Sequence, residues 1–170
     1  MSLAAIILTL VTLQRLGELV LARRNTERLK AHGAIEFDAE HYPLIVLVHT
    51  AWLLTLWTLG RDQDVNLWLL AVFIFLQCIR LWVLTTLGHR WTTRIIIVPG
   101  EPLIASGPYR YLPHPNYAVV VAEIAVLPLA LHLPVVAAIF TLLNAAVLVI
   151  RVRAEARALA AGVALSRAQP

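Results

Sequence analysis

The residues best suited to chemistry in this chain lie in the segment Gly107–Tyr117, which reads Gly-Pro-Tyr-Arg-Tyr-Leu-Pro-His-Pro-Asn-Tyr. Three prolines and one glycine keep the segment from forming a regular helix, and His114 stands between two of the prolines. So many polar side chains in one non-helical segment of an apolar chain indicate a site. His114 is the first candidate residue, because an imidazole can donate a hydrogen bond or exchange a proton near neutral pH. The alternative is that His114 only caps the following helix and that the prolines only mark its start.

Arg151 and Glu155 form a second candidate pair. They are four residues apart, so on a helix they lie on one face about one turn from each other. In that position they could contact two ligands side by side. The alternative is a plain salt bridge at the membrane surface, worth a few tenths of a kcal/mol.

The elements that position these residues must be helices in a membrane. With 60% hydrophobic residues, 14% charged residues and a mean hydropathy of +0.78, the chain is much more apolar than soluble proteins, in which about 25% of residues are charged. We therefore expect an all-α integral membrane protein of one domain, residues 1–170. The single cysteine, Cys78, excludes a disulfide within the chain and a cysteine-based zinc site.

The apolar runs predict about five transmembrane helices, at about 3–22, 43–60, 66–86, 117–132 and 134–151. The first run lacks the basic start and the cleavage site of a signal peptide, so we expect it to be retained. The last two runs are short and meet at Leu133–Pro134, which predicts a tight helical hairpin that need not cross the whole bilayer. Four full crossings with a re-entrant pair are the alternative. A C-terminal helix is expected after the hairpin.

Basic residues concentrate on one side of this arrangement. Eleven of the fourteen lie after the first span, before the fourth or after the fifth. These are Arg23, Arg24, Arg28, Lys30, Arg90, Arg94, Arg110, Arg151, Arg153, Arg157 and Arg167. The bias predicts an outside N-terminus, a cytoplasmic C-terminus and a cytoplasmic catalytic segment. Topology thus accounts for the net charge of +4, and no nucleic-acid-binding stripe is evident.

Two connecting segments have patterns of their own. The run Ile95–Val98 is β-branched and is followed by Pro99-Gly100, which predicts an extended segment and a turn. Its backbone must be sheltered by protein, by water or by a bound ligand. Residues 23–42 are charged and amphipathic, and they either lie along the membrane surface or simply connect two spans.

A few charged residues fall inside the predicted spans. Glu123 could pair with Arg80 or Arg15 across the bundle, whereas Arg15 and Glu18 are spaced to satisfy each other on the first span. Ionisable groups in a membrane are functional candidates by default. A transporter or a non-catalytic scaffold with an intramembrane polar pathway is therefore one alternative function.

The motifs together resemble a known family of membrane enzymes. The run Leu103–Arg110 leading into His114-Pro115-Asn116-Tyr117, followed by Arg151-Val152-Arg153-Ala154-Glu155, is similar to the isoprenylcysteine carboxyl methyltransferase family. Gly33–Glu36, His41-Tyr42, His49 and Trp91–Arg94 resemble a bacterial branch found with type III polyketide synthases, whose members O-methylate long-chain alkylpyrones or alkylresorcinols. The chain has Pro113 and Ala156 where the family has an arginine and a second glutamate. Arg110 is near enough in sequence to substitute for that arginine.

The resemblance implies S-adenosyl-L-methionine as methyl donor, S-adenosyl-L-homocysteine as product, and a cofactor-binding half at about residues 88–165. It implies that the cofactor pocket is lined by Leu103, Ile104, Tyr109, His114, Pro115, Asn116, Tyr117 and Glu155. Glu155 suits the cofactor ammonium and His114 its carboxylate. Arg151 matches an arginine on the acceptor side, and His114 and Arg151 are the expected catalytic residues. The bacterial branch and the distribution of basic residues together lead us to expect a multi-pass protein of the bacterial inner membrane with a cytoplasmic active site.

Methyl transfer of this kind requires alignment of the methyl donor with the acceptor and exclusion of water from the site, with little need for a metal. The expected acceptor is lipid-like, reaches the site laterally from the bilayer, and is methylated on a hydroxyl, enol or carboxyl group. A carboxylate or acidic enol needs no strong base, whereas a plain phenol would need one, for which His41, His49 and His89 are candidates. A nicotinamide-dependent membrane lipid reductase is the alternative enzyme.

Overall fold

The computed structural model describes residues 1–37, 40, 42–102 and 104–168, with side chains described as far as Gly162. The elements in chain order are α1 (Leu3–Ala31), β1 (Ile35–Phe37), α2 (Tyr42–Leu59), α3 (Leu67–Leu87), the short 3₁₀ helix η2 (Gly88–Arg90), β2 (Ile95–Ile97), the 3₁₀ helix η3 (Gly107–Arg110), α4 (Pro115–Ala130) and α5 (Pro134–Ala168). Within these residues, α1, α2, α3 and α5 are long and apolar enough to cross a membrane, and α4 is a shorter apolar helix. The prediction of an all-α integral membrane protein is confirmed.

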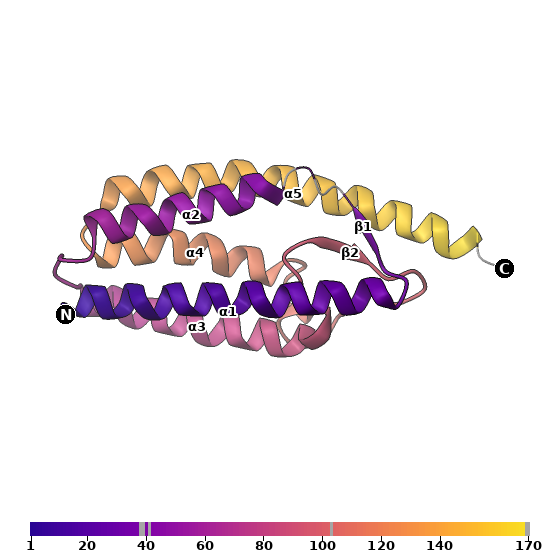
Figure 1. Cartoon of the computed structure of the whole chain (residues 1–170), viewed down its shortest axis with the longest axis horizontal. Helices are drawn as coiled ribbons and strands as arrows, with labels where there is room; N and C mark the ends of the chain where they lie inside the picture. Colours follow the sequence, from indigo (N-terminus) through magenta and orange to yellow (C-terminus); the bar gives the residue numbers. More distant parts are fainter. Residues whose placement is uncertain (38–39, 41, 103, 169–170) are drawn as a thin grey trace.

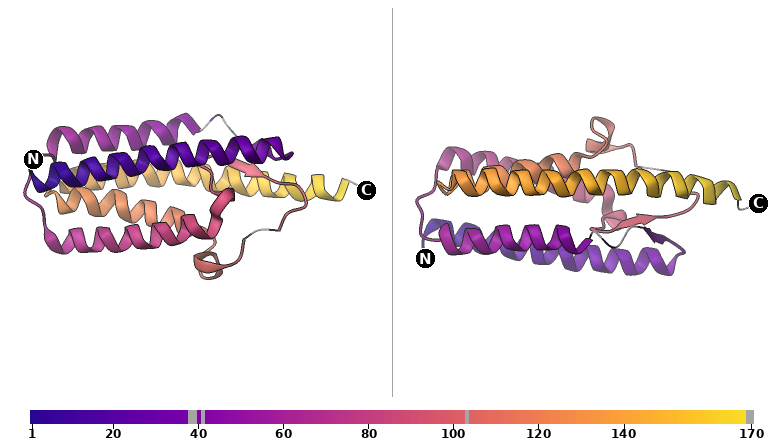
Figure 2. Two further views of the ribbon diagram at one scale, coloured as in Figure 1. Left: turned by 60° about the horizontal axis from the view of Figure 1, so that its bottom comes forward. Right: turned by 90° about the horizontal axis from the view of Figure 1, so that it is seen from above.

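The helices form an elongated bundle with the two chain ends at opposite ends (Figures 1 and 2). Helix α4 packs between α3 and α5, while α2 lies along α5 and α1 contacts α2 and η2. The predicted tight hairpin between the last two apolar runs is present, because only residues 131–133 separate α4 from α5. The connections that follow α1 and α3 and the C-terminal half of α5 all lie at the same end of the bundle (Figure 1).

Two helices are longer than predicted. Helix α1 continues past the expected end of its span to Ala31 and stops before Gly33, whose φ of 86° suits a glycine. Helix α5 is not short, because it runs 35 residues through both the fifth apolar run and the expected C-terminal helix. The reason is local: residues 135–161 contain no proline or glycine and are rich in alanine, the best helix former.

A small antiparallel sheet joins the connections at the site end. Strands β1 and β2 pair with the register Ile35↔Ile97, Glu36↔Ile96 and Phe37↔Ile95. The extended segment predicted at Ile95 is therefore confirmed. The 23–42 segment is neither a surface helix nor a simple connector throughout, since it continues α1 and then forms β1.

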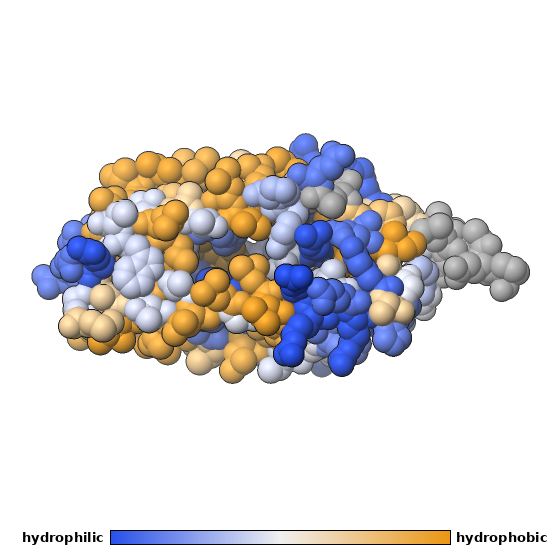
Figure 3. All heavy atoms as spheres, viewed as in Figure 1, coloured by the Kyte–Doolittle hydropathy of each residue, from blue (hydrophilic) through white to orange (hydrophobic). Residues whose placement is uncertain are grey.

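The sheet lies against α5, where Ile95 packs on Ala154 and Ala158. The fit is close, because a Cβ added to Gly162 would lie 2.7 Å from Ile97. A larger hydrophobic cluster of the core includes Trp52 and Leu127, and a smaller one includes Ala22, Val83 and Trp91. On the face shown in Figure 3, hydrophobic residues cover most of the bundle, and hydrophilic residues gather at its ends, most of them over the last turns of α1. This distribution suits a bilayer around the middle of the bundle.

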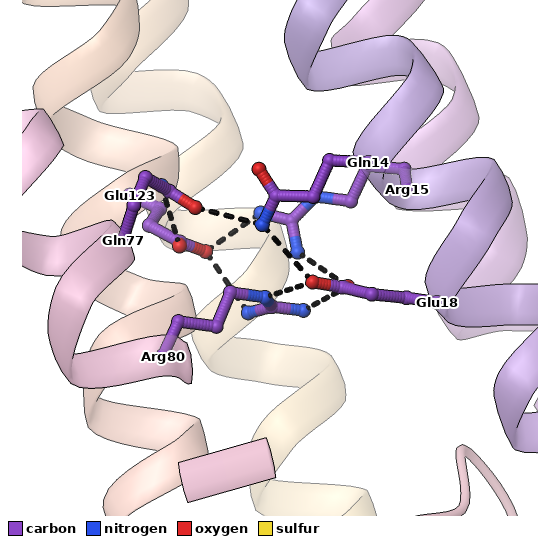
Figure 4. A network of polar contacts seen from close by, with 6 residues as sticks. All are labelled: Gln14, Arg15, Glu18, Gln77, Arg80 and Glu123. Carbon is purple, nitrogen blue, oxygen red and sulfur yellow. Dashed lines mark hydrogen bonds and ion pairs between the residues drawn. The ribbon is translucent and has the colours of Figure 1, made fainter. Parts of the chain in front are cut away.

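A charged network crosses the middle of the bundle. Its six residues are Gln14, Arg15 and Glu18 of α1, Gln77 and Arg80 of α3, and Glu123 of α4 (Figure 4).

Arg80 reaches Glu18 at 2.5 Å and Glu123 at 3.1 Å, and Arg15 reaches the same two carboxylates at 3.2 and 2.6 Å. The local pair of Arg15 with Glu18 and both expected partners of Glu123 are thus present together. Two arginines balance two glutamates, which makes burial in the membrane tolerable.

Candidate active site

A cavity of about 810 Å³ lies at the sheet end of the bundle. Its walls come from α1, the η2–β2 segment, the connection before η3, the start of α4 and the C-terminal half of α5. The predicted site residues that line it are Ile104, Tyr109, His114, Asn116, Tyr117, Arg151 and Glu155. The structure therefore brings the proline-rich segment and the C-terminal pair, about 40 residues apart in sequence, to one cavity.

Tyr117 connects the two parts of the site. Its hydroxyl donates to Glu155 Oε2 at 2.5 Å and accepts from Arg151 Nε at 2.8 Å. The Arg151 guanidinium also lies 5.7 Å from the centre of the Tyr117 ring. Arg151 and Glu155 share a helix face as predicted, but a direct ion pair between them is absent from the described residues. The expected alternative of a plain salt bridge does not describe this pair.

His114 faces the same carboxylate. It occupies the N-cap position of α4, yet its side chain makes no capping hydrogen bond. Instead Nδ1 lies 3.8 Å from Glu155 Oε2, and the imidazole stacks on the Tyr117 ring at 5.1 Å between centroids and 15° between planes. The His114 side chain therefore does not cap the helix, and the imidazole is held where it can contact a ligand beside Glu155.

Tyr109 forms another wall and is positioned by η3. The turn into η3 requires Gly107, which has φ of 55° and lies so close to α3 that an added Cβ would be 2.6 Å from Thr86 Oγ1. Burial raises the pKa of Tyr109 to about 12, and the nearby negative charge of Glu155 adds to the rise. Tyr109 therefore remains a neutral phenol at physiological pH and offers the cavity a hydroxyl and an aromatic face.

Other predicted site residues have different positions. Asn116 lines the cavity, and its Oδ1 is buried without a hydrogen-bond partner in the described part of the chain. Pro115 is buried as the first residue of α4 and does not line the cavity. Leu103 lies outside the described residues. Arg110, expected to replace the family arginine, is exposed and away from the cavity.

The cavity also has walls that sequence reasoning did not assign to the site. Trp91, Arg90 and Arg94 line it, together with β2. Arg90 donates to the Pro102 carbonyl at 2.7 Å and pairs with Glu101, which holds the connection over the cavity. The Trp91–Arg94 run was noted only for its resemblance. Trp91 and Tyr109 pack in one hydrophobic cluster, a contact between separate segments that no local pattern revealed.

The histidines considered as bases for a phenolic acceptor are not in the cavity. His49 lies on α2 with Nδ1 2.9 Å from the Ile45 carbonyl oxygen, and His89 is exposed on η2. His41 lies outside the described residues. Of the histidines that the structure describes, His114 alone lines the cavity.

Comparison with known proteins agrees with this architecture. A model of the isoprenylcysteine carboxyl methyltransferase family matches residues 69–161, more than half of the chain. The chain is 40% identical over 159 residues to YpbQ, an uncharacterized protein of Bacillus subtilis (strain 168), covering 91% of this chain and 95% of the relative.

A second relative, an uncharacterized protein of Haemophilus influenzae, is 27% identical over 108 residues, covering 61% of this chain and 63% of the relative. No solved structure matches the chain at a significant level. The family match contains α4, η3 and the Arg151–Glu155 pair, so it covers the residues on which the resemblance to the family was based. It does not reach Gly33–Glu36 or His49, and the resemblance to the bacterial branch stays a prediction. The chain belongs to the isoprenylcysteine carboxyl methyltransferase family, a family of membrane methyltransferases.

Proposed function

We propose that this protein is an S-adenosylmethionine-dependent O-methyltransferase that acts on a lipid-like acceptor. The observation that carries the proposal is the meeting of His114, Tyr117 and Glu155 around one cavity at the polar end of a membrane bundle. The family supports methyl transfer, and the site chemistry supports this donor. The same site would release S-adenosylhomocysteine.

The groups around the cavity fit the donor. Glu155 can accept hydrogen bonds from the ammonium of its amino-acid part. His114 can donate to the carboxylate because its imidazole is not used as a cap. The rings of Tyr109 and Tyr117 offer flat walls for adenine and for the sulfonium. The volume of about 810 Å³ is within the usual range for such ligands.

When bound, S-adenosylmethionine supplies a methyl group on a positively charged sulfur, and sulfur keeps the bonding electron pair as the methyl leaves. The protein contributes orientation and exclusion of water. Tyr117 holds Arg151 beside Glu155, so the acceptor side and the donor side have a common support. Arg151 has no carboxylate partner among the described residues, and its cation is therefore suited to hold an anionic acceptor oxygen.

The acceptor that fits best is an amphiphile with an acidic head. Leu29 of α1 and Leu87 of α3 line the cavity and can contact an apolar tail. His49 and His89 lie outside the cavity, so neither can act there as a base. An acceptor that is already ionised needs no such base. A long-chain enol or phenol, such as an alkylpyrone or alkylresorcinol, and a lipid carboxylate are the candidate classes.

The same proposal places the site at the cytoplasmic face of a bacterial inner membrane. The basic residues in the last turns of α1, before α4 and in the C-terminal half of α5 belong to segments at the cavity end of the bundle (Figure 1). Cytoplasmic loops carry such an excess of arginine and lysine. The donor is also made and kept in the cytoplasm, so a cytoplasmic cavity would have direct access to it.

The test is transfer of labelled methyl from S-adenosylmethionine to a lipid extract by the purified protein in lipid nanodiscs. We expect a labelled lipid product that His114→Ala abolishes by weakening donor binding. Arg151→Ala should mainly raise KM for the acceptor. Arg153→Ala is the control, because Arg153 is on the same helix but exposed and away from the cavity. Absence of both a labelled product and S-adenosylhomocysteine binding would overturn the proposal.

A further inference from the structure

One part of the cavity wall is a short connection, residues 98–102, which we call the strap. It contains no helix or strand and follows β2 at the end of the bundle where α1 also ends (Figure 1). Val98, Gly100, Glu101 and Pro102 line the cavity, and the last three are exposed. The strap therefore belongs to the polar end of the cavity.

The strap has a defined shape of its own. The Glu101 N–H donates to the Val98 carbonyl at 3.3 Å and closes a four-residue turn with Pro99 and Gly100 at its centre. Gly100 has φ of 79°, which is the value required at the third position of a type II turn, and proline is favoured at the second. A Cβ added to Gly100 would meet no atom within 4 Å. The turn is thus formed by its own residues and is not packed into place by other elements.

One side chain attaches the strap to the rest of the protein. Arg90 Nη1 donates to the Pro102 carbonyl at 2.7 Å, and Nη2 pairs with the Glu101 carboxylate. Within the described residues, no other hydrogen bond or ion pair joins the strap to another element. Arg90, Glu101 and Pro102 all line the cavity, so this attachment is itself part of the wall.

Arg90, in contrast, is held firmly from behind. The buried Asn25 of α1 donates through Nδ2 to the carbonyls of Gly88 and Trp91, at 3.1 and 2.8 Å, and these residues flank Arg90 on both sides. Trp91 also packs in a hydrophobic cluster with residues of α1 and α3. The backbone of Arg90 is therefore fixed to the bundle, whereas the polar contacts of the strap with the bundle come from the Arg90 guanidinium.

We propose that Arg90 is a positioning residue that latches the strap across the polar mouth of the cavity and so controls how fast the methyl donor enters and the product leaves. This inference rests on the proposed function. The donor is charged and water-soluble, so it enters from the polar end, whereas a lipid-like acceptor comes from the bilayer. When the contacts of Arg90 break, the preformed turn swings away as a unit. When they form again, the donor is enclosed and water is kept out.

The first arm of the experiment measures how fast labelled S-adenosylhomocysteine leaves the full-length protein in nanodiscs when unlabelled ligand is added in excess. We expect Arg90→Ala and Glu101→Gln each to raise the dissociation rate at least about fivefold, because each removes a hydrogen bond between charged groups. The charge swap Arg90→Glu with Glu101→Arg should restore most of the parent's rate. Arg23→Ala breaks the exposed pair with Glu27 on α1, outside the cavity, and should have no effect.

The second arm needs no ligand. Cys78, the only cysteine, is replaced by serine, and Leu159→Cys then places a thiol on the α5 wall of the cavity. We expect a water-soluble maleimide to label this thiol at least about fivefold faster when Arg90→Ala is added, and the charge swap to return the rate to that of the latched protein. A thiol introduced by Ala31→Cys, at the exposed end of α1 outside the cavity, should react equally in every background.

Unchanged labelling of the Leu159→Cys thiol in the Arg90→Ala background would overturn the inference, as would a charge swap that leaves dissociation as fast as in Arg90→Ala. If the Arg90 variants fail to fold, Glu101→Gln decides, because the Glu101 side chain is 45% exposed and lies in a connection. The labelling arm does not depend on the donor. Absence of S-adenosylhomocysteine binding in the parent would therefore contradict the proposed function, whereas unchanged labelling would contradict the latch alone.

Discussion

Arg151 and Glu155, one turn apart on α5, are joined through the hydroxyl of Tyr117 on α4. The hydroxyl accepts from Arg151 Nε at 2.8 Å and donates to Glu155 Oε2 at 2.5 Å. This bridge fixes the start of α4 against α5 and leaves the second Glu155 oxygen without a hydrogen-bond partner among the described residues. The proposed donor-binding and acceptor-binding side chains are therefore oriented by a single residue.

Tyr117→Phe tests the bridge. The substitution keeps the ring that stacks on His114 but removes the hydroxyl, so both Arg151 and Glu155 lose one hydrogen bond. We expect S-adenosylhomocysteine affinity to fall by about 1 kcal/mol, or roughly fivefold in Kd, measured by calorimetric titration.

Tyr111→Phe is the control for that experiment, because Tyr111 is 74% exposed and lies outside the cavity. It should bind S-adenosylhomocysteine as the parent does. An unchanged Kd in Tyr117→Phe would mean that the bridge does not orient the binding residues.

Local sequence features predicted much of the fold. Hydropathy located the helices, and Leu133–Pro134 located the hairpin, because both signals depend on neighbouring residues. The end of α1 was missed, because the charged residues 23–31 are compatible with either a helix or a connector. The helix ends just before Gly33. The pairing of β1 with β2 joins segments about 60 residues apart and had no local signal.

In the site, too, local features predicted some residues, whereas contacts between distant segments were not predictable. Motif resemblance identified His114, Tyr117 and Glu155, and helical spacing placed Arg151 on the face of Glu155. Spacing alone could not reveal that Tyr117 would stand between them, because that contact depends on how α4 packs on α5. Trp91 could not be assigned to the cavity either, since the η2–β2 connection and the buried Arg80 together determine its position.

Glu123→Ala tests the intramembrane network. It leaves Arg15 and Arg80 without one of their two carboxylates inside the bundle. Removing one partner of a buried pair costs about 3–5 kcal/mol, so we expect a large fall in the free energy of unfolding, measured in detergent micelles. Glu27→Ala breaks the pair with Arg23, whose side chains are 64% and 83% exposed, and should cost less than about 0.5 kcal/mol. Similar costs for the two variants would show that the network adds no stability.

Gly107→Ala tests how η3 positions Tyr109. A Cβ at this position would clash with Thr86, and a φ of 55° is unfavourable for alanine by about 1–2 kcal/mol. We expect lower stability and weaker S-adenosylhomocysteine binding. Gly33→Ala also has a positive φ and meets no atom within 4 Å, and Gly33 does not line the cavity, so this variant measures backbone strain alone. If Gly107→Ala is no worse than Gly33→Ala, close contact with Thr86 is unimportant.

The acid stability of the sheet end should depend on Glu36. Burial alone would raise the pKa of Glu36, but hydrogen bonds from Lys30 and Arg94 outweigh burial and lower this pKa below its ordinary value of 4.5. The resulting stabilisation is therefore complete above pH 4.5 and is lost as the pH falls through the lowered folded-state value.

Glu36→Gln should make the free energy of unfolding less sensitive to pH in that acid range, as followed by chemical denaturation. Glu27→Gln, on the exposed face of α1, is the matched control and should keep the parent's pH profile. A parent-like profile in Glu36→Gln would contradict the proposed contribution of Lys30 and Arg94.

The central claim is that Glu155 binds the methyl donor, and calorimetric titration of S-adenosylhomocysteine into the parent protein and Glu155→Gln tests it most directly. The amide keeps the size of the side chain but lacks the charge that an ammonium group requires. We predict a measurable Kd for the parent and one at least about tenfold weaker for Glu155→Gln, because a hydrogen bond to a charged group is lost. Equal affinity in the two proteins, or no binding by the parent up to millimolar ligand, would contradict the account.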